Sequence, residues 1–242
     1  MGGTYTIKAL IDADTICYAV AAVCEEESKN ICLDTLHSSV TDLLFALPEC
    51  ETTLFYLSGA DNFRKTNYSW YKANREGKER PKHLTACKRF LENEYKATWS
   101  KNQEADDDIG IEVFRDPSAT CLIVHVDKDL DQFPGLHYNC RKKEFYEVTE
   151  DQAKKWFIHQ LVLGDRSDNI TGFDGIMRKE YVKKHQYIKD TIEQEDDWME
   201  NLRFVWDLYN HHERADMFHD NADCLWLLKE PDKNWKSLAI QI

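Results

Sequence analysis

Short apolar runs alternate with longer amphipathic segments along the chain, and this alternation predicts strands and helices in turn. The runs Tyr5–Ile11, Thr52–Leu57 and Cys121–Val126 are rich in apolar and β-branched side chains, which is typical of buried strands. Residues Leu136–Val148 predict a hairpin that turns at Arg141–Lys143. The third run is apolar along almost its whole length, so we expect a central, parallel strand there. The pattern indicates an α/β fold with a central, mainly parallel sheet flanked by helices.

Amphipathic segments between these runs predict the helices, which are Thr15–Val23, Leu36–Leu47, His83–Trp99 and Asp151–Leu163. Thr149 is the expected N-cap of the last helix. For the first helix, Asp14 suits the N-cap position better than Asp12 does. Lys29–Thr35 is interpreted as a further strand of a hairpin. The tryptophans after Asp190 are expected to pack in a core.

Composition limits the class of protein further. The chain has 242 residues, which suits one large domain or two small ones, and 44 acidic residues against 31 basic residues give a net charge of −13. None of the eight cysteines forms a CxxC pair, so we expect buried thiols in a reducing compartment. The chain shows no secretory signal pattern and no apolar run of roughly 18 residues. These features predict a soluble, cytoplasmic protein without a membrane segment.

The segment from Arg64 to Lys101 reverses the overall charge. It carries eleven basic and four acidic residues, a local net charge of +7. Tyr68, Trp70 and Tyr71 are interleaved with the basic residues. Cations that meet phosphates and rings that meet bases are what a nucleic-acid strand requires. A solvated helical face is the alternative interpretation.

Acidic residues gather at four places in the chain. The clusters are Asp12/Asp14, Glu104/Asp106/Asp107/Asp108, Asp127/Asp129 and Asp165/Asp168. Three of them follow apolar segments, and the carboxyl ends of adjacent parallel strands meet at one edge of a sheet. So many carboxylates in one pocket require cations, and Mg²⁺ or Mn²⁺ prefer such oxygen ligands. The alternatives are helix capping and a solvated surface, and His125 is interpreted as a core histidine.

The motifs that are missing exclude other chemistry. The chain has no Gly-x-x-x-x-Gly-Lys phosphate loop and no recognisable serine or cysteine nucleophile motif. The glycines of Gly164–Gly175 permit close approach of the backbone to a phosphate. Carboxylates for metal ions beside a basic, aromatic segment indicate a nuclease that uses two metal ions roughly 4 Å apart.

These motifs together resemble the phage and bacterial 5′→3′ exonucleases of the flap-endonuclease superfamily. The matching segments, in the family's order, are Ile11–Asp14, Tyr71–Arg75 with Pro81, Glu104–Asp107, Asp127–Gln132 and Gly164–Gly172 running on to Ile176. They cover about residues 5–185. The chain departs from the family pattern at Ser58, where relatives often carry an aspartate, and at Met177, where relatives usually carry a glycine.

The resemblance implies a helical arch and a helix–two-turn–helix motif on the α/β core. It implies a single nuclease domain over residues 1–242, with a metal-binding core at 1–150 that includes the arch at 60–101, and a helical region at 151–242. The implied activity is two-metal-dependent hydrolysis of DNA at 5′ ends, flaps, nicks or gaps, or of RNA·DNA hybrids, by a monomer. The alternatives are a non-catalytic protein that binds DNA junctions and a PIN-type ribonuclease.

The resemblance also assigns roles to individual residues. The implied metal ligands are Asp12, Glu104, Asp106, Asp107 and Asp127 for the first ion, and Asp129, Asp165 and Asp168 for the second. Lys72 and Arg75 are expected to contact the scissile phosphate, and Tyr71 to stack on a base. The expected DNA contacts are Arg64, Lys65, Arg80, Lys82, Ser167, Gly172, Gly175, Arg178 and Lys179. A K⁺ ion at the helix–two-turn–helix loop is a further implied ligand.

Overall fold

The computed structural model describes residues 7–116, 119–173, 186–238 and 240. The chain forms two compact units. Unit 1 comprises Met1–Asn62, Gly77–Leu130 and Gly135–Val148, and unit 2 comprises Phe63–Glu76, Asp131–Pro134 and Thr149–Ile242. The segment expected to form the arch is therefore divided between the two units.

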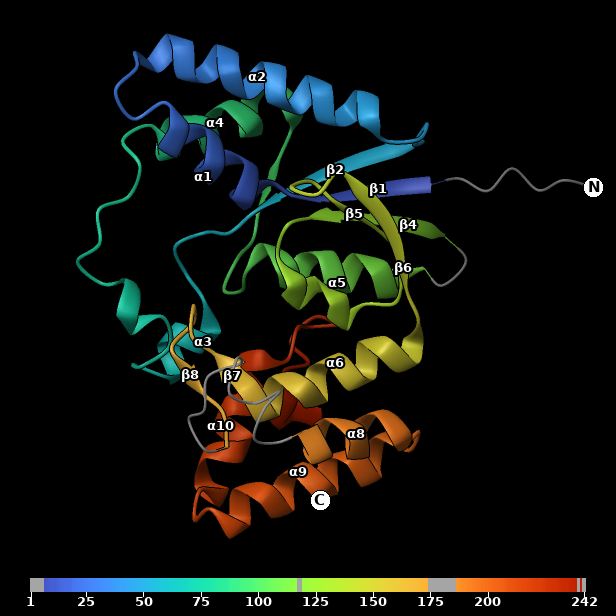
Figure 1. Ribbon diagram of the computed structural model, residues 1–242. Helices are drawn as coiled ribbons and strands as arrows, with labels where there is room; N and C mark the ends of the chain where they lie inside the picture. The colour runs from blue at the N-terminus through green and yellow to red at the C-terminus, as the bar shows by residue number, and fades with distance from the viewer. Residues whose placement is uncertain (1–6, 117–118, 174–185, 239, 241–242) are drawn as a thin grey trace, which may run out of the picture. The chain divides into compact units, whose positions relative to one another are not determined.

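Unit 1 is built around a six-stranded sheet of order β3-β2-β1-β4-β5-β6 (Figure 1). Its strands are β1 (Ile7–Asp12), β2 (Thr52–Leu57), β3 (Thr98–Trp99), β4 (Thr120–His125), β5 (Gly135–Asn139) and β6 (Glu144–Val148). All neighbouring strands pair in parallel except β5 and β6, which form the predicted hairpin. The prediction of a central, mainly parallel sheet is confirmed.

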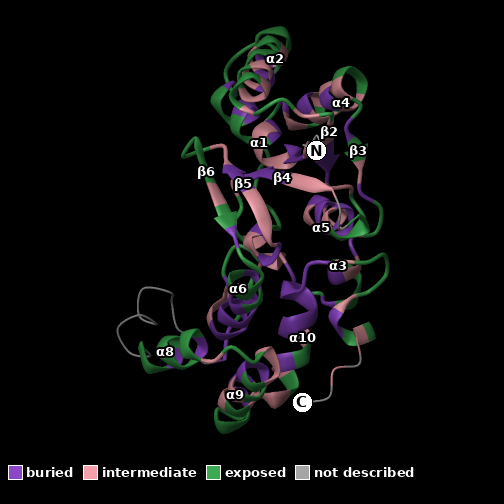
Figure 2. Ribbon diagram, turned by 90° about the vertical axis from the view of Figure 1, so that its right-hand side faces the viewer, coloured by how far each residue is buried: buried purple, intermediate pink, exposed green. Residues whose placement is uncertain are grey.

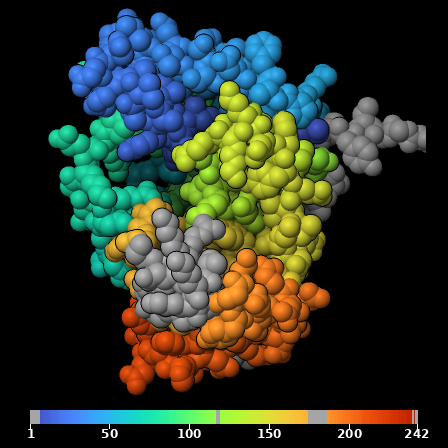
Figure 3. Space-filling model, in the orientation of Figure 1, coloured from blue at the N-terminus to red at the C-terminus, as the bar shows by residue number. Residues whose placement is uncertain are grey.

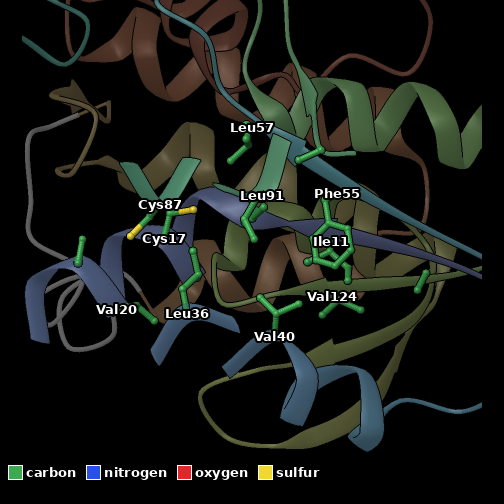
Figure 4. Packing of buried hydrophobic residues seen from close by; sticks show 14 of the residues in the cluster. Ile11, Cys17, Val20, Leu36, Val40, Phe55, Leu57, Cys87, Leu91 and Val124 are labelled. Atoms are coloured by element: carbon green, nitrogen blue, oxygen red, sulfur yellow. The ribbon is translucent and has the colours of Figure 1, made fainter. Parts of the chain in front are cut away.

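Helices cover both faces of this sheet (Figure 2). They are α1 (Ala13–Val23), α2 (Lys29–Ala46), α4 (Leu84–Tyr95) and α5 (Ala105–Arg115), and η2 (Lys128–Gln132) follows β4. Side chains of α1, α2 and α4 pack on the face that carries Ile11, Phe55 and Val124, as Figure 4 shows. Helix α5 covers the other face, where the Lys8 Nζ atom donates a hydrogen bond to Glu112 Oε1 at 3.0 Å.

Three local predictions for this unit are wrong. The helix predicted for His83–Trp99 ends at Tyr95, and Thr98–Trp99 form strand β3 beside β2. Lys29–Thr35 is not a strand, because Ser28 caps a continuous helix α2 and accepts a hydrogen bond from the Ile31 amide at 3.4 Å. Its buried residues Cys32, Leu36 and Val40 follow a helical spacing of four. The N-cap of α1 is Asp12 rather than Asp14.

On the side of unit 1 shown in Figure 3, side chains of α1 and α2, in blue, and of the β5–β6 hairpin, in yellow-green, lie at the surface. All eight cysteines are free thiols, as predicted, but Cys50, Cys121 and Cys140 are only partly buried. Among the described residues, no helix combines the length and the apolar character that a membrane crossing requires.

Unit 2 is mainly helical. Its helices are α3 (Phe63–Asn67), α6 (Glu150–Leu163), α8 (Gln186–Gln194), α9 (Trp198–His211) and α10 (Ala215–Leu225), with the short turns η1 (Ala73–Arg75) and η3 (Trp235–Leu238). The strands β7 (Gly164–Asp165) and β8 (Ile170–Thr171) form a small antiparallel hairpin. Thr149 caps α6 as predicted, because its side chain accepts the Gln152 amide at 3.2 Å.

Aromatic packing and one buried cation hold unit 2 together. The ring of Phe157 lies 5.0 Å from that of Trp226 and 5.4 Å from that of Trp235, which confirms a packing role for these late tryptophans. Arg64 has no exposed surface, and it donates hydrogen bonds to the carbonyl oxygens of Cys224 and Trp226 at 2.9 and 2.6 Å. This is a structural role, whereas the sequence interpretation made Arg64 a DNA contact.

Two glycines allow the β7–β8 hairpin to close tightly on the end of α6. Gly164 has a φ of +65°, and a Cβ atom there would lie 2.3 Å from the Ile170 carbonyl oxygen. A Cβ atom on Gly172 would lie 2.1 Å from the Val162 carbonyl oxygen. Both positions therefore exclude any side chain.

Candidate active site

The carboxyl ends of three parallel strands bring Asp12, Ser58 and Asp127 to one edge of the sheet. Asp12 ends β1, Ser58 follows β2, and Asp127 lies just beyond β4. The register pairs Ile11 with Val124 and Asp12 with Tyr56, so these three strands end at the same level. The sequence predicts this arrangement for the acidic clusters Asp12/Asp14 and Asp127/Asp129.

The pKa of Asp12 is strongly perturbed at this edge. Its side chain is only 5% exposed, and it accepts hydrogen bonds from the Thr15 hydroxyl at 2.6 Å and from the Asp14 amide at 3.1 Å. Burial first, then the negative charge of Asp14, raises the pKa of Asp12 to about 7, and Asp127 adds to the effect. A buried carboxylate with further carboxylates around it suits a hard divalent cation, which prefers oxygen ligands and relieves the repulsion.

The start of α5 carries the central acidic cluster. Glu104 is the N-cap residue, and Asp107, which is fully buried, accepts the Glu104 amide at 3.0 Å. Asp106 is half-buried on the same first turn. Asp107 therefore holds the helix start that positions Glu104 and Asp106, in addition to any role as a ligand.

Asp127 is exposed, and its local backbone is held by a buried histidine. The Nδ1 atom of His125 forms a hydrogen bond with the Asp127 carbonyl oxygen. On its other side, His125 Nε2 lies 2.9 Å from His137 Nδ1 and 3.1 Å from the Tyr146 hydroxyl. Burial lowers the pKa of His125, so the ring favours the neutral form. His125 is buried and hydrogen-bonded, as expected of a core histidine, and it also belongs to a group with His137 and Asp131 whose ligand atoms could hold a metal ion.

Asp129 lies on η2, beside the Asp127 turn. Its amide donates a hydrogen bond to Asp127 Oδ1 at 3.0 Å, and its carboxylate lies 3.5 Å from the ammonium group of Lys128. The hydrogen bond from the Asp129 amide to Asp127 fixes the backbone that follows β4.

Lys88 is a residue of this edge that sequence reasoning missed. Its ammonium group lies 2.5 Å from Asp14 Oδ1 and 3.3 Å from the Ser58 carbonyl oxygen. The sequence does carry a signal, because Lys88 interrupts the apolar stripe that Leu84, Cys87 and Leu91 form on α4. A charged residue inside such a stripe indicates an acidic partner.

The second predicted carboxylate set lies in unit 2, at the β7–β8 hairpin. Asp165 is 8% exposed and accepts hydrogen bonds from the Ser167 amide at 2.6 Å and the Ser167 hydroxyl at 2.7 Å. Asp168 accepts hydrogen bonds from Arg75 Nη2 at 2.6 Å and the Tyr71 hydroxyl at 2.9 Å, and Lys72 Nζ lies 3.4 Å away. The three predicted catalytic residues are thus grouped around one predicted metal ligand.

Backbone contacts fix this grouping within unit 2. The Lys72 amide donates to the Asp168 carbonyl oxygen at 2.9 Å, and Lys72 itself has a positive φ of 57°. Arg75 Nε donates to the Ser167 carbonyl oxygen at 2.9 Å. The side chain of Tyr71 is 4% exposed, so stacking on a base would require its ring to move.

The remaining predicted DNA contacts differ in their surroundings. Lys65, Arg80, Lys82 and Ser167 are exposed, whereas Gly172 is buried against the end of α6. Gly175, Arg178 and Lys179 lie outside the described residues, as does Met177.

Comparison with known proteins rests on the fold. No protein-family model matches the chain, and no curated protein matches it. Solved structures do match, and they show that the chain shares the α/β fold of a 5′-exonuclease and flap endonuclease.

The structures in question are those of bacteriophage T5 5′-exonuclease. The T5 protein co-crystallised with metal ions matches with a TM-score of 0.55 and 16% identity, over 90% of this chain and 93% of that chain. A T5 flap endonuclease in a pseudo-enzyme–product complex with DNA and metal ions matches with a TM-score of 0.53 and 16% identity, over 90% and 93%. T5 5′-exonuclease with bound zinc matches with a TM-score of 0.53 and 15% identity, over 90% and 93%.

Proposed function

We propose that the protein is a metal-dependent nuclease that hydrolyses phosphodiester bonds of DNA at 5′ ends, flaps or nicks, as a cytoplasmic monomer. The α/β fold shared with T5 5′-exonuclease supports this class of activity, and the T5 structures with DNA and metal ions indicate the kinds of ligand. RNA·DNA hybrids are a second substrate that the same chemistry would accept.

The observation that carries the proposal is the environment of Asp12. A buried carboxylate with two acidic neighbours is unfavourable for folding alone, since burial and repulsion both raise its pKa. Groups perturbed in this way are concentrated at functional sites. A protein that only bound DNA would gain nothing from this arrangement, whereas a metal-dependent nuclease requires it.

The carboxylates suggest how ions would be held. Asp12, Glu104, Asp106 and Asp127 would hold one divalent cation, Mg²⁺ or Mn²⁺, with Asp107 supporting them. Asp165 and Asp168, which both lie in unit 2, would hold the other. When bound, such ions activate water and stabilise charge that develops on phosphate oxygens.

Lys72 and Arg75 would bind the scissile phosphate. Both cations already face an anionic oxygen, because they contact the Asp168 carboxylate in this structure. A phosphate offers them the same geometry and a greater negative charge. Lys65, Arg80, Lys82 and Ser167 are further proposed contacts to the DNA backbone, as are Gly175, Arg178 and Lys179, which lie outside the described residues. A K⁺ ion at the helix–two-turn–helix loop is a further proposed ligand.

The test is digestion of 5′-labelled flap, nicked and blunt duplexes with Mg²⁺, Mn²⁺ or EDTA. We expect metal-dependent release of short 5′ products, and its loss in Asp127→Ala and Asp165→Ala. Asp34→Asn, which changes an exposed carboxylate on α2, is the matched control and should cleave like the unmodified protein.

Two outcomes would contradict the proposal. Cleavage that persists undiminished in EDTA would exclude the use of divalent ions. DNA binding without any metal-stimulated cleavage, on all three substrates, would favour the non-catalytic junction-binding protein instead.

A further inference from the structure

Asp12 and Asp14 lie two residues apart at the same sheet edge, yet their surroundings differ in charge. Asp12 accepts hydrogen bonds from uncharged donors, the Thr15 hydroxyl and the Asp14 amide. Asp14 instead forms an ion pair with Lys88, whose ammonium group lies 2.5 Å from its Oδ1 atom. The side chains of the pair are only 18% and 27% exposed, so solvent screens the interaction incompletely.

The second oxygen of Asp14 is engaged as well. The Ser58 amide donates a hydrogen bond to Asp14 Oδ2 at 2.9 Å, and the Ser58 hydroxyl accepts the Ala105 amide at 3.0 Å. Lys88 closes the group through its contact with the Ser58 carbonyl oxygen. These contacts join α4, the start of α1, the end of β2 and the start of α5.

Ser58 is neutral, whereas relatives of the family often carry an aspartate at this position, so the edge has one negative charge fewer. The ion pair between Lys88 and Asp14 neutralises a second negative charge of the edge. To bind an ion, Asp14 would first have to give up its ion pair with Lys88, whereas Asp12 would give up only hydrogen bonds from uncharged donors.

We propose that Lys88 is a positioning residue that holds Asp14 out of the cation-binding set, so that Asp12 and Asp127 bind the ion while Asp14 anchors α4 and α5 around it. This inference rests on the proposed function and deepens it, since it states which acidic residues of the edge are ligands. Lys88 also contributes a fixed positive charge that weakens the attraction of the edge for divalent ions.

The test measures Mn²⁺ binding to the full chain without DNA. The free ion is quantified by electron paramagnetic resonance. In Lys88→Met, Asp14 is released and the positive charge is lost. For a unit charge on the order of 6 Å from a divalent ion in water, the affinity should rise on the order of tenfold. Lys142→Met, which removes an exposed lysine of the β5–β6 turn, is the matched control and should leave the affinity unchanged.

The double variant Lys88→Met/Asp14→Asn distinguishes this role from direct ligation by Asp14. Removing a neutral pair leaves the net charge of the edge unchanged, so the affinity should stay within about twofold of the unmodified protein. If Asp14 is itself a ligand, the double variant should instead bind roughly tenfold more weakly or worse. Lys88→Arg, which keeps the pair, should also stay within about twofold, and it provides the test if the double variant does not fold.

Asp12→Asn separates this inference from the proposed function. All the Mn²⁺ affinities in this test refer to the binding site that Asp12→Asn is expected to abolish. If Asp12→Asn leaves Mn²⁺ binding intact, the proposed metal site itself is wrong. If Asp12→Asn abolishes binding but Lys88→Met does not strengthen it, the role of Lys88 is wrong and the nuclease proposal stands.

Discussion

Replacing Asp12 by asparagine should stabilise the metal-free protein at neutral and alkaline pH, although it removes a proposed metal ligand. Asparagine caps helices about as well as aspartate, so the N-cap of α1 is kept. What is lost is a buried negative charge that faces Asp14 and Asp127.

The pH dependence follows from the direction of the pKa change. The pKa of Asp12 is raised from 3.8 in the unfolded chain to about 7 in the folded protein, so the protonated form favours the folded state. This stabilisation is complete below about pH 4 and is lost as the pH rises through about 7. An ionisation displaced that far corresponds to roughly 4 kcal/mol, which is an upper limit for the gain in the variant.

The assay is urea denaturation of both proteins in EDTA at pH 5 and pH 8. The advantage of Asp12→Asn in the free energy of unfolding should be larger at pH 8 than at pH 5. Mn²⁺ should then stabilise the unmodified protein at pH 8 much more than the variant. Asp34→Asn on α2 is the control for the loss of an exposed carboxylate. The reasoning is refuted if the difference in the free energy of unfolding between the unmodified protein and Asp12→Asn does not change with pH.

Three further predictions test other parts of the structure. Gly172→Ala should cost about 3 kcal/mol or more in thermal denaturation, since its Cβ atom would lie 2.1 Å from the Val162 carbonyl oxygen; an unchanged melting temperature would contradict this. Tyr68→Phe should cost about 1–3 kcal/mol in urea denaturation, because it removes the 2.9 Å hydrogen bond to the buried Asp223, and a neutral effect would show that water replaces it. Lys72→Ala should slow cleavage far more than it weakens DNA binding, because phosphate charge increases in the transition state, and equal losses would exclude that role.

Strands β1 and β4 were predictable because they bury both faces and therefore appear as continuous apolar runs. The residues directly after β1 and β4 were expected at one edge for a general reason, namely that parallel strands point the same way. Helix α2 was predicted only in part. Its first two turns carry Ile31, which is exposed, and Cys32, which is buried, and a short apolar run of this kind does not distinguish helix from strand.

The contacts of charged residues were much less predictable than the elements that carry them. Arg64 belongs to a basic segment that reads as a DNA-binding surface, yet it is fully buried and donates hydrogen bonds to backbone carbonyl oxygens. Composition averages over a segment, whereas burial is decided residue by residue through tertiary packing. Arg64 and Lys65 belong to the same basic segment, but Arg64 donates its hydrogen bonds to residues some 160 positions away in the chain. Local sequence does not indicate such distant partners.

The same limit explains why the fold could be inferred before the ligand set. Asp12, Asp14 and Asp127 are equivalent in sequence, since each follows an apolar strand and each is an aspartate. The structure separates them by their partners: a hydroxyl and an amide for Asp12, an ammonium group for Asp14, and the amide of Asp129 for Asp127. On the proposal made above, the choice of the carboxylate that binds an ion depends on Lys88, a residue of α4 that no acidic motif includes.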